Sequence, residues 1–332
     1  MNGPLINLIA QQFGVKVSKQ RKIRDGIYRV VTSNGKTFSL KRMPLQVRRL
    51  MWMDRVLFRI QRNGSLLAWR NPKTIEGRKP YVTFRRRNHY VLIPWISGRK
   101  PSPRSLKDMR ACGVALARFH KAGRVVLKGK TAYSEIGLWS STLGKREGFI
   151  ENKIRIAKRN GFSLPIRTFI KQHGEEILRY SKQASSMLRG SSYHTYRRYP
   201  RKTGVLCHGD GGPSNFIIND KGTYLIDFEA LHVNLRAYDL YRVIYNSCKD
   251  YKWNFSIASA ILDGYRKVSK LHKNDFKLLR VWLRFPLTTF FVLSPTKRFP
   301  FTKSKLQWAL ESERRIGPFI KKLDNYAGKH CS

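Results

Sequence analysis

Acidic residues are scarce in this chain. Its 332 residues include 20 Asp and Glu against 67 Lys and Arg, which leaves a formal net charge of +47. This excess is far larger than solubility requires, so an anionic partner or surface is expected. The sign of the charge does not determine the fold, but it makes each carboxylate among apolar residues more informative. Four such carboxylates, Asp210, Asp227, Glu229 and Asp239, occur within one stretch.

Cysteine is also rare, and long hydrophobic runs are missing. The four cysteines form no CxxC pair and no metal-ligand spacing, which favours reduced thiols in a cytosolic setting. The N-terminus lacks a basic start followed by an apolar run and a cleavage site, so we expect no secretion signal. The best apolar run, Phe285 to Leu293, has about half of the roughly 20 residues that a membrane span requires. A buried helix is expected there, and no membrane span.

The N-terminal part of the chain has the pattern of a small antiparallel sheet. A hydrophobic content of 41%, with 12% aromatic residues, is enough for a substantial core and excludes disorder for most of the chain. Residues 19–43 alternate apolar and polar side chains around Asn34-Gly35, which predicts a hairpin. Residues 47–62 have helical spacing, and residues 79–96 read as two strands around a polar turn at 86–89. The predicted order is β-β-α-β-β.

The pattern changes abruptly after Pro94. The Pro- and Ser-rich segment 97–105 breaks the strands, and helical periodicity dominates beyond it. Residues 105–123 begin with a Ser cap and predict a buried helix. Residues 145–202 are strongly basic and weakly periodic, and amphipathic helices return after residue 250. We therefore predict an α+β, two-lobed chain with an N-lobe of residues 1–97 and a mainly helical C-lobe of residues 98–332.

The four informative carboxylates lie in or near the sequence HGDGGPSN, which begins at His208. A short buried strand, residues 205–207, precedes this Gly-rich loop, and two strands joined by a turn at 219–222 follow it. Such a hairpin brings Asn215 and Asp227 together at its open end. Oxygen ligands of this kind suit Mg²⁺ bridging phosphates, and Asp210 could accept the proton of an attacking hydroxyl. The stretch predicts a phosphoryl-transfer site.

These residues also carry a resemblance to known proteins. The pattern HxDxxxxN, the downstream IDFE, the further Asp239, LARFH (116–120) and FSLKRM (38–43) resemble the aminoglycoside phosphotransferase and choline kinase superfamily, in its order. Within that protein-kinase-like superfamily the chain is most similar to CotS-type spore-coat proteins. That likeness rests on LKR, on YVLIPWISGR (90–99) and on CHGDGGPSNFII. The resemblance spans roughly residues 20–320.

The resemblance implies ATP and Mg²⁺ as cofactors and assigns roles by motif. Asp210 would be the catalytic base in a motif shared with His208, and His208 and Asp239 would organise the loop. Asn215 and Asp227 would bind Mg²⁺, and Glu229 would add a metal contact through water. Lys41 would touch the nucleotide phosphates, and Pro94, Trp95 and Ile96 would form the hinge against which adenine stacks. A role in the mother-cell cytoplasm with deposition in the spore coat, among anionic coat components, is also implied.

Two departures keep a second hypothesis open. The first hairpin lacks a glycine-rich phosphate loop, and the helix at 47–62 has no Glu to pair with Lys41, only Asp54. A weak or inactive kinase-fold scaffold of the spore coat is therefore the alternative. No helix-turn-helix, zinc finger or RNA-binding aromatic motif organises the basic excess, so nucleic acid is not the expected partner. The hydroxyl acceptor is unidentified, and an anionic or neutral one is expected because an acidic pocket is difficult to build here.

Overall fold

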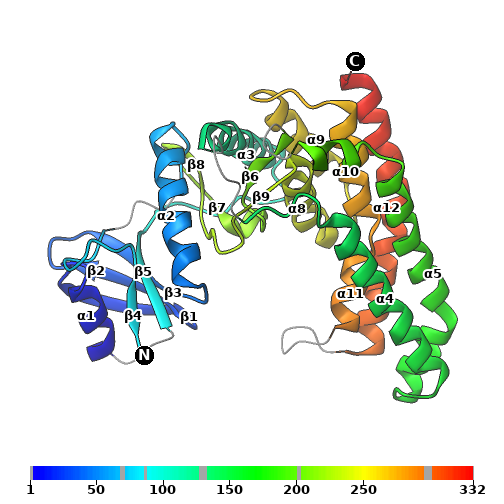
Figure 1. The fold of residues 1–332 in the computed structure, drawn as a ribbon, viewed down its shortest axis with the longest axis horizontal. Coiled ribbons are helices and arrows are strands. Elements are labelled where there is room, and N and C mark those ends of the chain that lie inside the picture. Colours follow the sequence, from blue (N-terminus) through cyan, green and yellow to red (C-terminus); the bar gives the residue numbers. More distant parts are fainter. Residues whose placement is uncertain are drawn as a thin grey trace.

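The computed structural model describes residues 3–67, 72–85, 88–126, 133–199, 203–294 and 301–331. The N-terminal elements are α1 (Gly3–Gln11), β1 (Val17–Arg24), β2 (Ile27–Thr32), β3 (Thr37–Met43), α2 (Val47–Arg62), β4 (Val82–Phe84) and β5 (Asn88–Pro94). The strands form one sheet in the order β1-β2-β3-β5-β4, in which every pair is antiparallel. The N-terminus lies in this small lobe (Figure 1).

The predicted hairpin at residues 19–43 contains three strands rather than two. The expected turn at Asn34-Gly35 joins β2 to β3, and a second turn at Asp25-Gly26 joins β1 to β2. Gly26 has φ +72°, a conformation that glycine adopts without steric cost, so Asp-Gly was the signal for this turn. The predicted helix at 47–62 is confirmed as α2. Two residues of the predicted 86–89 turn, 86 and 87, lie outside the described residues.

The alternation of side chains along the strands gives the sheet two different buried faces. Tyr90 and Leu92 of β5 point toward α1 and belong to a small core with Ile6 and Ile9. Val91, between them, points the other way and joins a large core shared with α2 and the helical lobe. Figure 1 shows α2 between the sheet and the C-lobe. Since α2 contributes to the large core, it fixes the sheet against the rest of the molecule.

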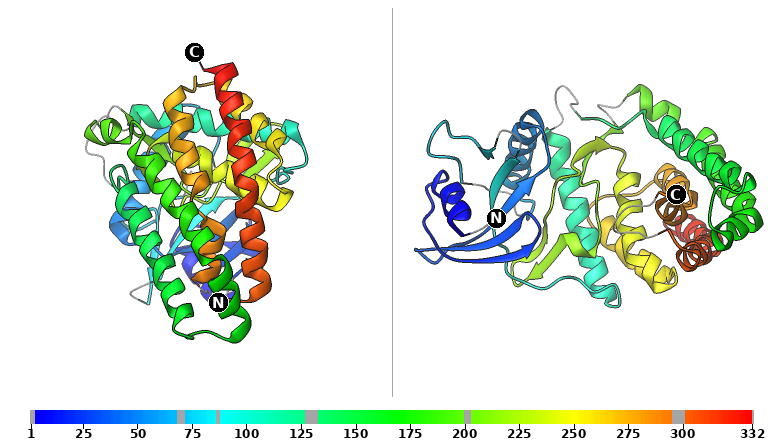
Figure 2. Two further views of the ribbon diagram at one scale, coloured as in Figure 1. Left: turned by 90° about the vertical axis from the view of Figure 1, so that its right-hand side faces the viewer. Right: turned by 90° about the horizontal axis from the view of Figure 1, so that it is seen from below.

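The C-lobe is built mainly of helices around two short pairs of strands. Its elements are α3 (Leu106–Val126), α4 (Trp139–Lys158), α5 (Leu164–Arg189), α6 (Tyr193–Arg198), β6 (Val205–Cys207), η1 (Pro213–Asn215), β7 (Phe216–Asn219), β8 (Gly222–Leu225), β9 (His232–Asn234), α8 (Arg236–Cys248), η2 (Lys249–Tyr251), α9 (Phe255–Arg266), α10 (Lys273–Arg284), α11 (Leu287–Leu293) and α12 (Lys303–His330). β6 pairs with β9, and β7 pairs with β8. The long helices α4, α5 and α12 lie on the side away from the small lobe (Figures 1 and 2).

Several predictions from the sequence agree with these elements. The helix expected at 105–123 is α3, and the apolar run at 285–293 contains the short buried helix α11. The basic and weakly periodic stretch at residues 145–202 includes most of α4 and all of α5, which are long helices. No helix among the described residues is both long enough and apolar enough to cross a membrane. The boundary between lobes at residues 97 and 98 stays a prediction.

Candidate active site

The loop that carries HGDGGPSN lies between β6 and β7, and Asp239 of α8 binds its backbone. Asp239 is fully buried and accepts hydrogen bonds from the backbone N–H groups of His208 (2.6 Å) and Gly209 (2.8 Å). Its Oδ2 also lies 3.0 Å from Nε2 of His120, which belongs to the LARFH motif. Burial raises the pKa of the Asp239 carboxyl, but His120 and the loop donors outweigh it and hold that pKa below its usual value. An ionised Asp239 thus organises the loop.

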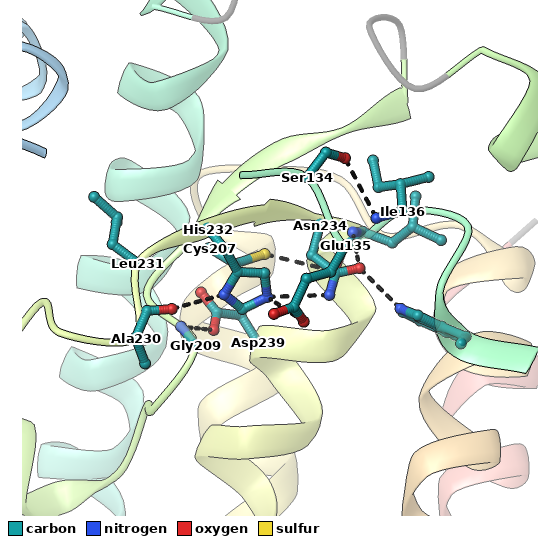
Figure 3. Close-up of polar contacts among 12 residues, drawn as sticks. Ser134, Glu135, Ile136, Cys207, Gly209, Ala230, Leu231, His232, Asn234 and Asp239 are labelled. Carbon is teal, nitrogen blue, oxygen red and sulfur yellow. Dashed lines mark hydrogen bonds and ion pairs between the residues drawn. The ribbon is translucent and has the colours of Figure 1, made fainter. Parts of the chain in front are cut away.

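The underside of the loop is packed closely, which explains its glycine at position 209. Gly209 has φ +82°, and a Cβ atom there would lie 2.2 Å from the carbonyl oxygen of Ala230. Nδ1 of His232 donates to that same carbonyl at 2.7 Å, and its Nε2 lies 3.4 Å from Glu135 Oε2 and 3.1 Å from Asn234 Nδ2 (Figure 3). Nothing in the sequence had pointed to this layer beneath the loop.

His208 is a structural part of the loop. Its side chain is fully buried, and Nε2 lies 2.8 Å from the carbonyl oxygen of Ile226. Its Nδ1 accepts from the N–H of Asp210 at 3.3 Å, and its ring packs on Phe228 with 5.0 Å between centroids. His208 therefore ties the start of the loop to the end of the following hairpin.

Asp210 is the exposed carboxylate of the loop. Its side chain is 52% exposed, and Oδ1 lies 2.5 Å from Nη2 of Arg242. Asn215 is buried, and its Nδ2 donates to the carbonyl oxygen of Asp210 at 2.7 Å and faces Asp210 Oδ2 at 3.4 Å. Asp210 is thus the loop carboxylate that an incoming hydroxyl can reach. Arg242 was not expected from the sequence, although its position three residues after Asp239 places it on the same helix.

The β7–β8 hairpin brings Asn215 and Asp227 to its open end, as the sequence predicted. Phe216 pairs with Leu225, and the N–H of Ile226 donates to the carbonyl oxygen of Asn215 at 3.0 Å. Asp227 follows at once and has φ +67°, a left-handed conformation that turns the chain out of the strand. This conformation is uncommon for a residue with a side chain, although Asp adopts it more readily than most.

Lys41 of β3 connects the small lobe to this hairpin. Its Nζ lies 2.6 Å from Asp227 Oδ1 and 2.9 Å from Glu229 Oε1, and its side chain is 8% exposed. Burial raises the pKa of Asp227, but Lys41 and then Arg24 outweigh it and hold that pKa below its usual value. Asp54, the acid on α2, pairs with Lys73 instead. Lys41 therefore finds its carboxylates on the C-lobe, where the IDFE sequence supplies both.

Cations surround the same place on the small-lobe side. Lys41 and Glu229 line a cavity of about 350 Å³ together with Arg24 and Arg42. Nη2 of Arg24 lies 3.1 Å from Asp227 Oδ2, and Arg42 pairs with Asp25 at 3.2 Å. Arg24 was missed in the sequence because, in a chain with 67 Lys and Arg, one more basic residue at a strand end carries no signal.

The predicted hinge residues continue from β5 along the start of β3. Pro94 pairs with Phe38, and the N–H of Trp95 donates to the carbonyl oxygen of Thr37 at 3.0 Å. Pro94, Trp95 and Ile96 are all half-buried, and the guanidinium of Arg29 lies 5.2 Å from the centre of the Trp95 ring. Pro94 and Trp95 thus contact the start of β3, the strand that carries Lys41, and the hinge role of residues 94–96 stays a prediction.

The oxygen donors at the open end of the hairpin fit a hard cation. Asn215, Asp227 and Glu229 offer amide and carboxylate oxygens, which Mg²⁺ prefers, and Asp227 stays ionised beside Lys41. A second group of metal-ligand types, His120, Cys207 and Asp239, is wholly buried. Burial raises the pKa of the Cys207 thiol far above its usual value, and both Asp239 oxygens already accept hydrogen bonds. That group is a hydrogen-bonded support of the loop.

A small sheet with a buried lysine, a helical lobe, an HxDxxxxN loop and a hairpin that ends in Asp together define a kinase-like phosphotransferase fold. The chain belongs to the phosphotransferase enzyme family typified by the aminoglycoside phosphotransferases (APH), whose family model matches residues 24–269. The predicted α+β, two-lobed kinase-like fold and the superfamily resemblance are thereby confirmed.

Solved structures agree with this assignment of the fold. An aminoglycoside phosphotransferase from Alicyclobacillus acidocaldarius is 19% identical, with a TM-score of 0.81 over 97% of this chain and 96% of that one. Spectinomycin phosphotransferase APH(9)-Ia, in complex with ADP and spectinomycin, is 14% identical, with a TM-score of 0.66 over 97% and 98%. A microcompartment-associated aminopropanol kinase is 14% identical, with a TM-score of 0.64 over 97% and 98%. No curated protein matches the chain by sequence.

Proposed function

We propose that this protein transfers the γ-phosphoryl group of ATP to a hydroxyl of an acceptor, with Mg²⁺ as cofactor. The observation that carries the proposal is the cluster in which Lys41 Nζ lies 2.6 Å from Asp227 and 2.9 Å from Glu229, beside an exposed Asp210. Burying a lysine with two carboxylates costs desolvation free energy, and phosphoryl transfer requires such preorganised charge.

Each residue of the cluster has a defined task in this proposal. Asp210 accepts the proton of the acceptor hydroxyl, and Lys41 moves from the carboxylates to the nucleotide phosphates. Asn215 and Asp227 would hold Mg²⁺, with Glu229 contributing through water. Bound there, the cation would neutralise charge on the phosphates. Asp239 and His208 keep the loop in register, so that Asp210 needs little reorganisation when the acceptor arrives.

The structural neighbours support the choice of cofactor. The spectinomycin phosphotransferase was solved with ADP, and an amicoumacin kinase was solved with AMP-PNP and Ca²⁺. The predicted hinge at Pro94, Trp95 and Ile96 would receive adenine in this chain, since Pro94 pairs with Phe38 on the strand that carries Lys41. ATP with Mg²⁺ is therefore the donor that we propose.

Nucleotide binding is the first test. Adding ATP or ADP with Mg²⁺ should raise the Tm of the wild type by several degrees, because a ligand that binds only the folded state stabilises it. Asp227→Ala should abolish that shift, whereas Asp250→Ala, which changes an exposed carboxylate outside the cluster, should keep it. An unchanged Tm for the wild type, or a full shift for Asp227→Ala, would overturn the proposal.

The finer placement of the chain rests on its CotS-like segments. LKR, YVLIPWISGR and CHGDGGPSNFII resemble spore-coat proteins of the CotS type, so we include in the proposal a product of the mother-cell cytoplasm that is deposited in the coat. The formal charge of +47 supports adhesion to anionic coat components. Fluorescence microscopy of a tagged copy in sporulating cells tests this placement, and a diffuse signal in the finished spore would contradict it.

A catalytically weak scaffold is the second candidate. It is favoured by the absence of a glycine-rich loop at the Asp25-Gly26 turn and by the ion pair that occupies Asp210. A variant with Asp210→Ala and Asp227→Ala separates the two functions. Normal coat assembly by this folded variant would favour the scaffold, and loss of assembly despite normal folding would favour the enzyme.

A further inference from the structure

The candidate base of the site is held by an arginine of the C-lobe. Arg242 Nη2 lies 2.5 Å from Asp210 Oδ1, and the Arg242 side chain is only 17% exposed whereas that of Asp210 is 52% exposed. The other carboxylate oxygen of Asp210 faces Asn215 Nδ2 at 3.4 Å. An acceptor hydroxyl that delivers its proton to Oδ1 must therefore compete with a guanidinium. Something has to draw Arg242 away.

An aromatic wall extends from Arg242 toward a second arginine. Tyr238 and Tyr241, on the same helix as Arg242, contact the Trp282 ring at 5.2 and 5.8 Å between centroids. The guanidinium of Arg146, from α4, lies 5.5 Å from the Trp282 centroid and also over the rings of Phe285 and Phe290. Both arginines affect the Tyr238 hydroxyl. Burial raises the pKa of Tyr238, and the positive charges of Arg242 and Arg146 oppose that rise.

Arg146 has a charge that the described residues do not neutralise. No carboxylate among them lies within ion-pair distance of its guanidinium, which is half-buried against aromatic rings. A cation in such surroundings has lost part of its hydration, so an anion that reaches it binds more strongly than in open water. Arg146 is therefore a better binding group than a fully solvated surface arginine.

Carboxylates that could hold a cationic acceptor are already engaged. The pairs at the site are Asp210 with Arg242, Asp227 with Lys41 and Arg24, and Glu229 with Lys41. Glu135, which is half-exposed near Tyr238, faces His232 Nε2 at 3.4 Å. Because it is exposed and near Tyr238, Glu135 is the carboxylate on which we expect a cationic acceptor to depend.

We propose that the acceptor carries an anionic group, a carboxylate or a phosphate, near its reactive hydroxyl, and that Arg242 and Arg146 bind this anion. The inference rests on the proposed phosphotransferase function. Arg242 exchanges the Asp210 carboxylate for the anion of the acceptor, which frees Oδ1. The acceptor oxygen then forms a bond to the γ-phosphorus, the bond from that phosphorus to the leaving ADP oxygen breaks, and the hydroxyl proton passes to Asp210.

Four small alcohols with one carbon skeleton test the charge of the acceptor. Glycerate is anionic, glyceramide is neutral and aminopropanediol is cationic, and glycerol phosphate adds a phosphate to the same skeleton. Transfer of labelled phosphate from ATP should occur with glycerate or glycerol phosphate and fall at least tenfold with the other two. In the presence of ADP and Mg²⁺, the same two anions should raise the Tm.

Variants at the second arginine test the residues. Arg146→Gln should raise the KM for the anionic acceptor by about tenfold to hundredfold, as expected for loss of a charge-assisted contact, and leave the KM for ATP unchanged. Arg146→Lys, which keeps the charge, should recover part of the loss. Arg315→Gln, on the exposed surface of α12, is the matched control and should change neither value.

The phosphotransferase function and the anionic acceptor fail under different results. If nucleotide with Mg²⁺ does not raise the Tm, the phosphotransferase function fails. If nucleotide binds but the cationic alcohol is the better acceptor and its use depends on Glu135, shown by Glu135→Gln, the anionic acceptor is wrong. Nucleotide binding without transfer to, or binding of, either anion also overturns it, as does an unchanged KM in Arg146→Gln.

Discussion

Single residues set the chemistry of this site through their neighbours rather than through their own types. Lys41 is one of 67 basic residues, yet it is buried and lies between two carboxylates of the other lobe. Asp239 is one of 20 acidic residues, and it holds the backbone of the HGDGGPSN loop at His208 and Gly209. Two residues of ordinary type thus join the lobes and shape the loop, so their replacement should have large effects.

Asp239→Asn should weaken both the fold and the loop. The carboxylate accepts hydrogen bonds from the N–H groups of His208 and Gly209 and faces His120. In asparagine, an NH₂ group replaces one of the two accepting oxygens, so that two hydrogen-bond donors would face each other. We expect a loss of about 2–4 kcal/mol in the free energy of unfolding, measured with urea. Asp250→Asn, at an exposed carboxylate, should stay within about 0.5 kcal/mol of wild type. Equal stabilities for the two variants would contradict the role of Asp239.

Glu313 should make the stability fall as the pH rises. It is fully buried, its Oε1 accepts from the N–H of Thr288 at 3.0 Å, and Arg284 donates to its backbone oxygen at 3.3 Å. Burial raises its pKa from 4.5 to about 8, although Arg284 opposes the rise. Between these two values the folded chain keeps a proton that the unfolded chain has lost. The free energy of unfolding should therefore fall with rising pH, by on the order of 1 kcal/mol per pH unit.

Glu313→Gln isolates that contribution, because glutamine keeps the shape and cannot ionise. Urea unfolding across the window from about pH 5 to about pH 8 should show a steeper decline for wild type than for the variant. The Glu311→Gln variant, at an exposed position of the same helix, should follow wild type. Parallel curves for wild type and Glu313→Gln would mean that the carboxyl is ionised in the folded chain.

At the scale of elements, the linker between β5 and α3, residues 95–105, is hydrogen-bonded to the β7–β8 hairpin. Arg99 and Ile218 exchange backbone hydrogen bonds at 3.0 and 2.9 Å, and Asn219 Nδ2 donates to the carbonyl oxygen of Ser97 at 2.9 Å. Arg99 is itself fixed by two hydrogen bonds to Asp108 of α3, at 2.5 and 2.8 Å. The linker therefore positions the small lobe against the hairpin that ends in the metal-ligand candidates.

Gly98→Ala should disturb this contact. Gly98 has φ +150°, and a Cβ atom there would lie 2.5 Å from the backbone oxygen of Ile218. We expect a loss of about 1–3 kcal/mol in the free energy of unfolding and a weaker Tm shift with ATP. Gly144→Ala is the matched control, since a Cβ atom there meets nothing within 4 Å and α4 should gain about 0.5–1 kcal/mol. A Gly98→Ala variant as stable as Gly144→Ala would refute the account of the linker.

Elements with strong local signals could be predicted from the sequence, and contacts between distant elements could not. The helix α2 begins and ends where its apolar spacing and the Asn63-Gly64 stop indicated. The hairpin was predictable because its turn and strands are local, and it places Asn215 beside Ile226 and Asp227. The partners of Lys41, by contrast, come from residues more than 180 positions away.

The missed site residues were arginines, for a reason of composition. Arg24 and Arg242 both bind carboxylates of the site, at 3.1 and 2.5 Å, but no local pattern distinguishes them from the other basic residues of the chain. Carboxylates were informative because they are few. In a chain of this composition the acidic half of a site can be found by motif, and the basic half requires the structure.

At the scale of the whole molecule, the net charge of +47 must oppose folding. Like charges repel more strongly when the chain is compact, and salt screens that repulsion. Raising the ionic strength from about 0.01 M to about 0.15 M shortens the Debye length from about 30 Å to about 8 Å. The Tm should therefore rise by several degrees over that range, as measured by calorimetry. For a protein of balanced charge, the loss of surface ion pairs would oppose this gain.

If the positive charge serves adhesion, an anionic polymer should raise the Tm as salt does. At low ionic strength, polyphosphate should raise the Tm more than sodium chloride of equal ionic strength does, because a polyanion binds several cations of the folded surface together. Sucrose, which is uncharged, controls for general exclusion effects. A Tm that is unaffected by salt and by polyphosphate would show that repulsion among the cations does not limit stability and that the polyanion does not bind the folded surface. The charge would then give no support to adhesion, and the proposal of a coat partner would lose its physical basis.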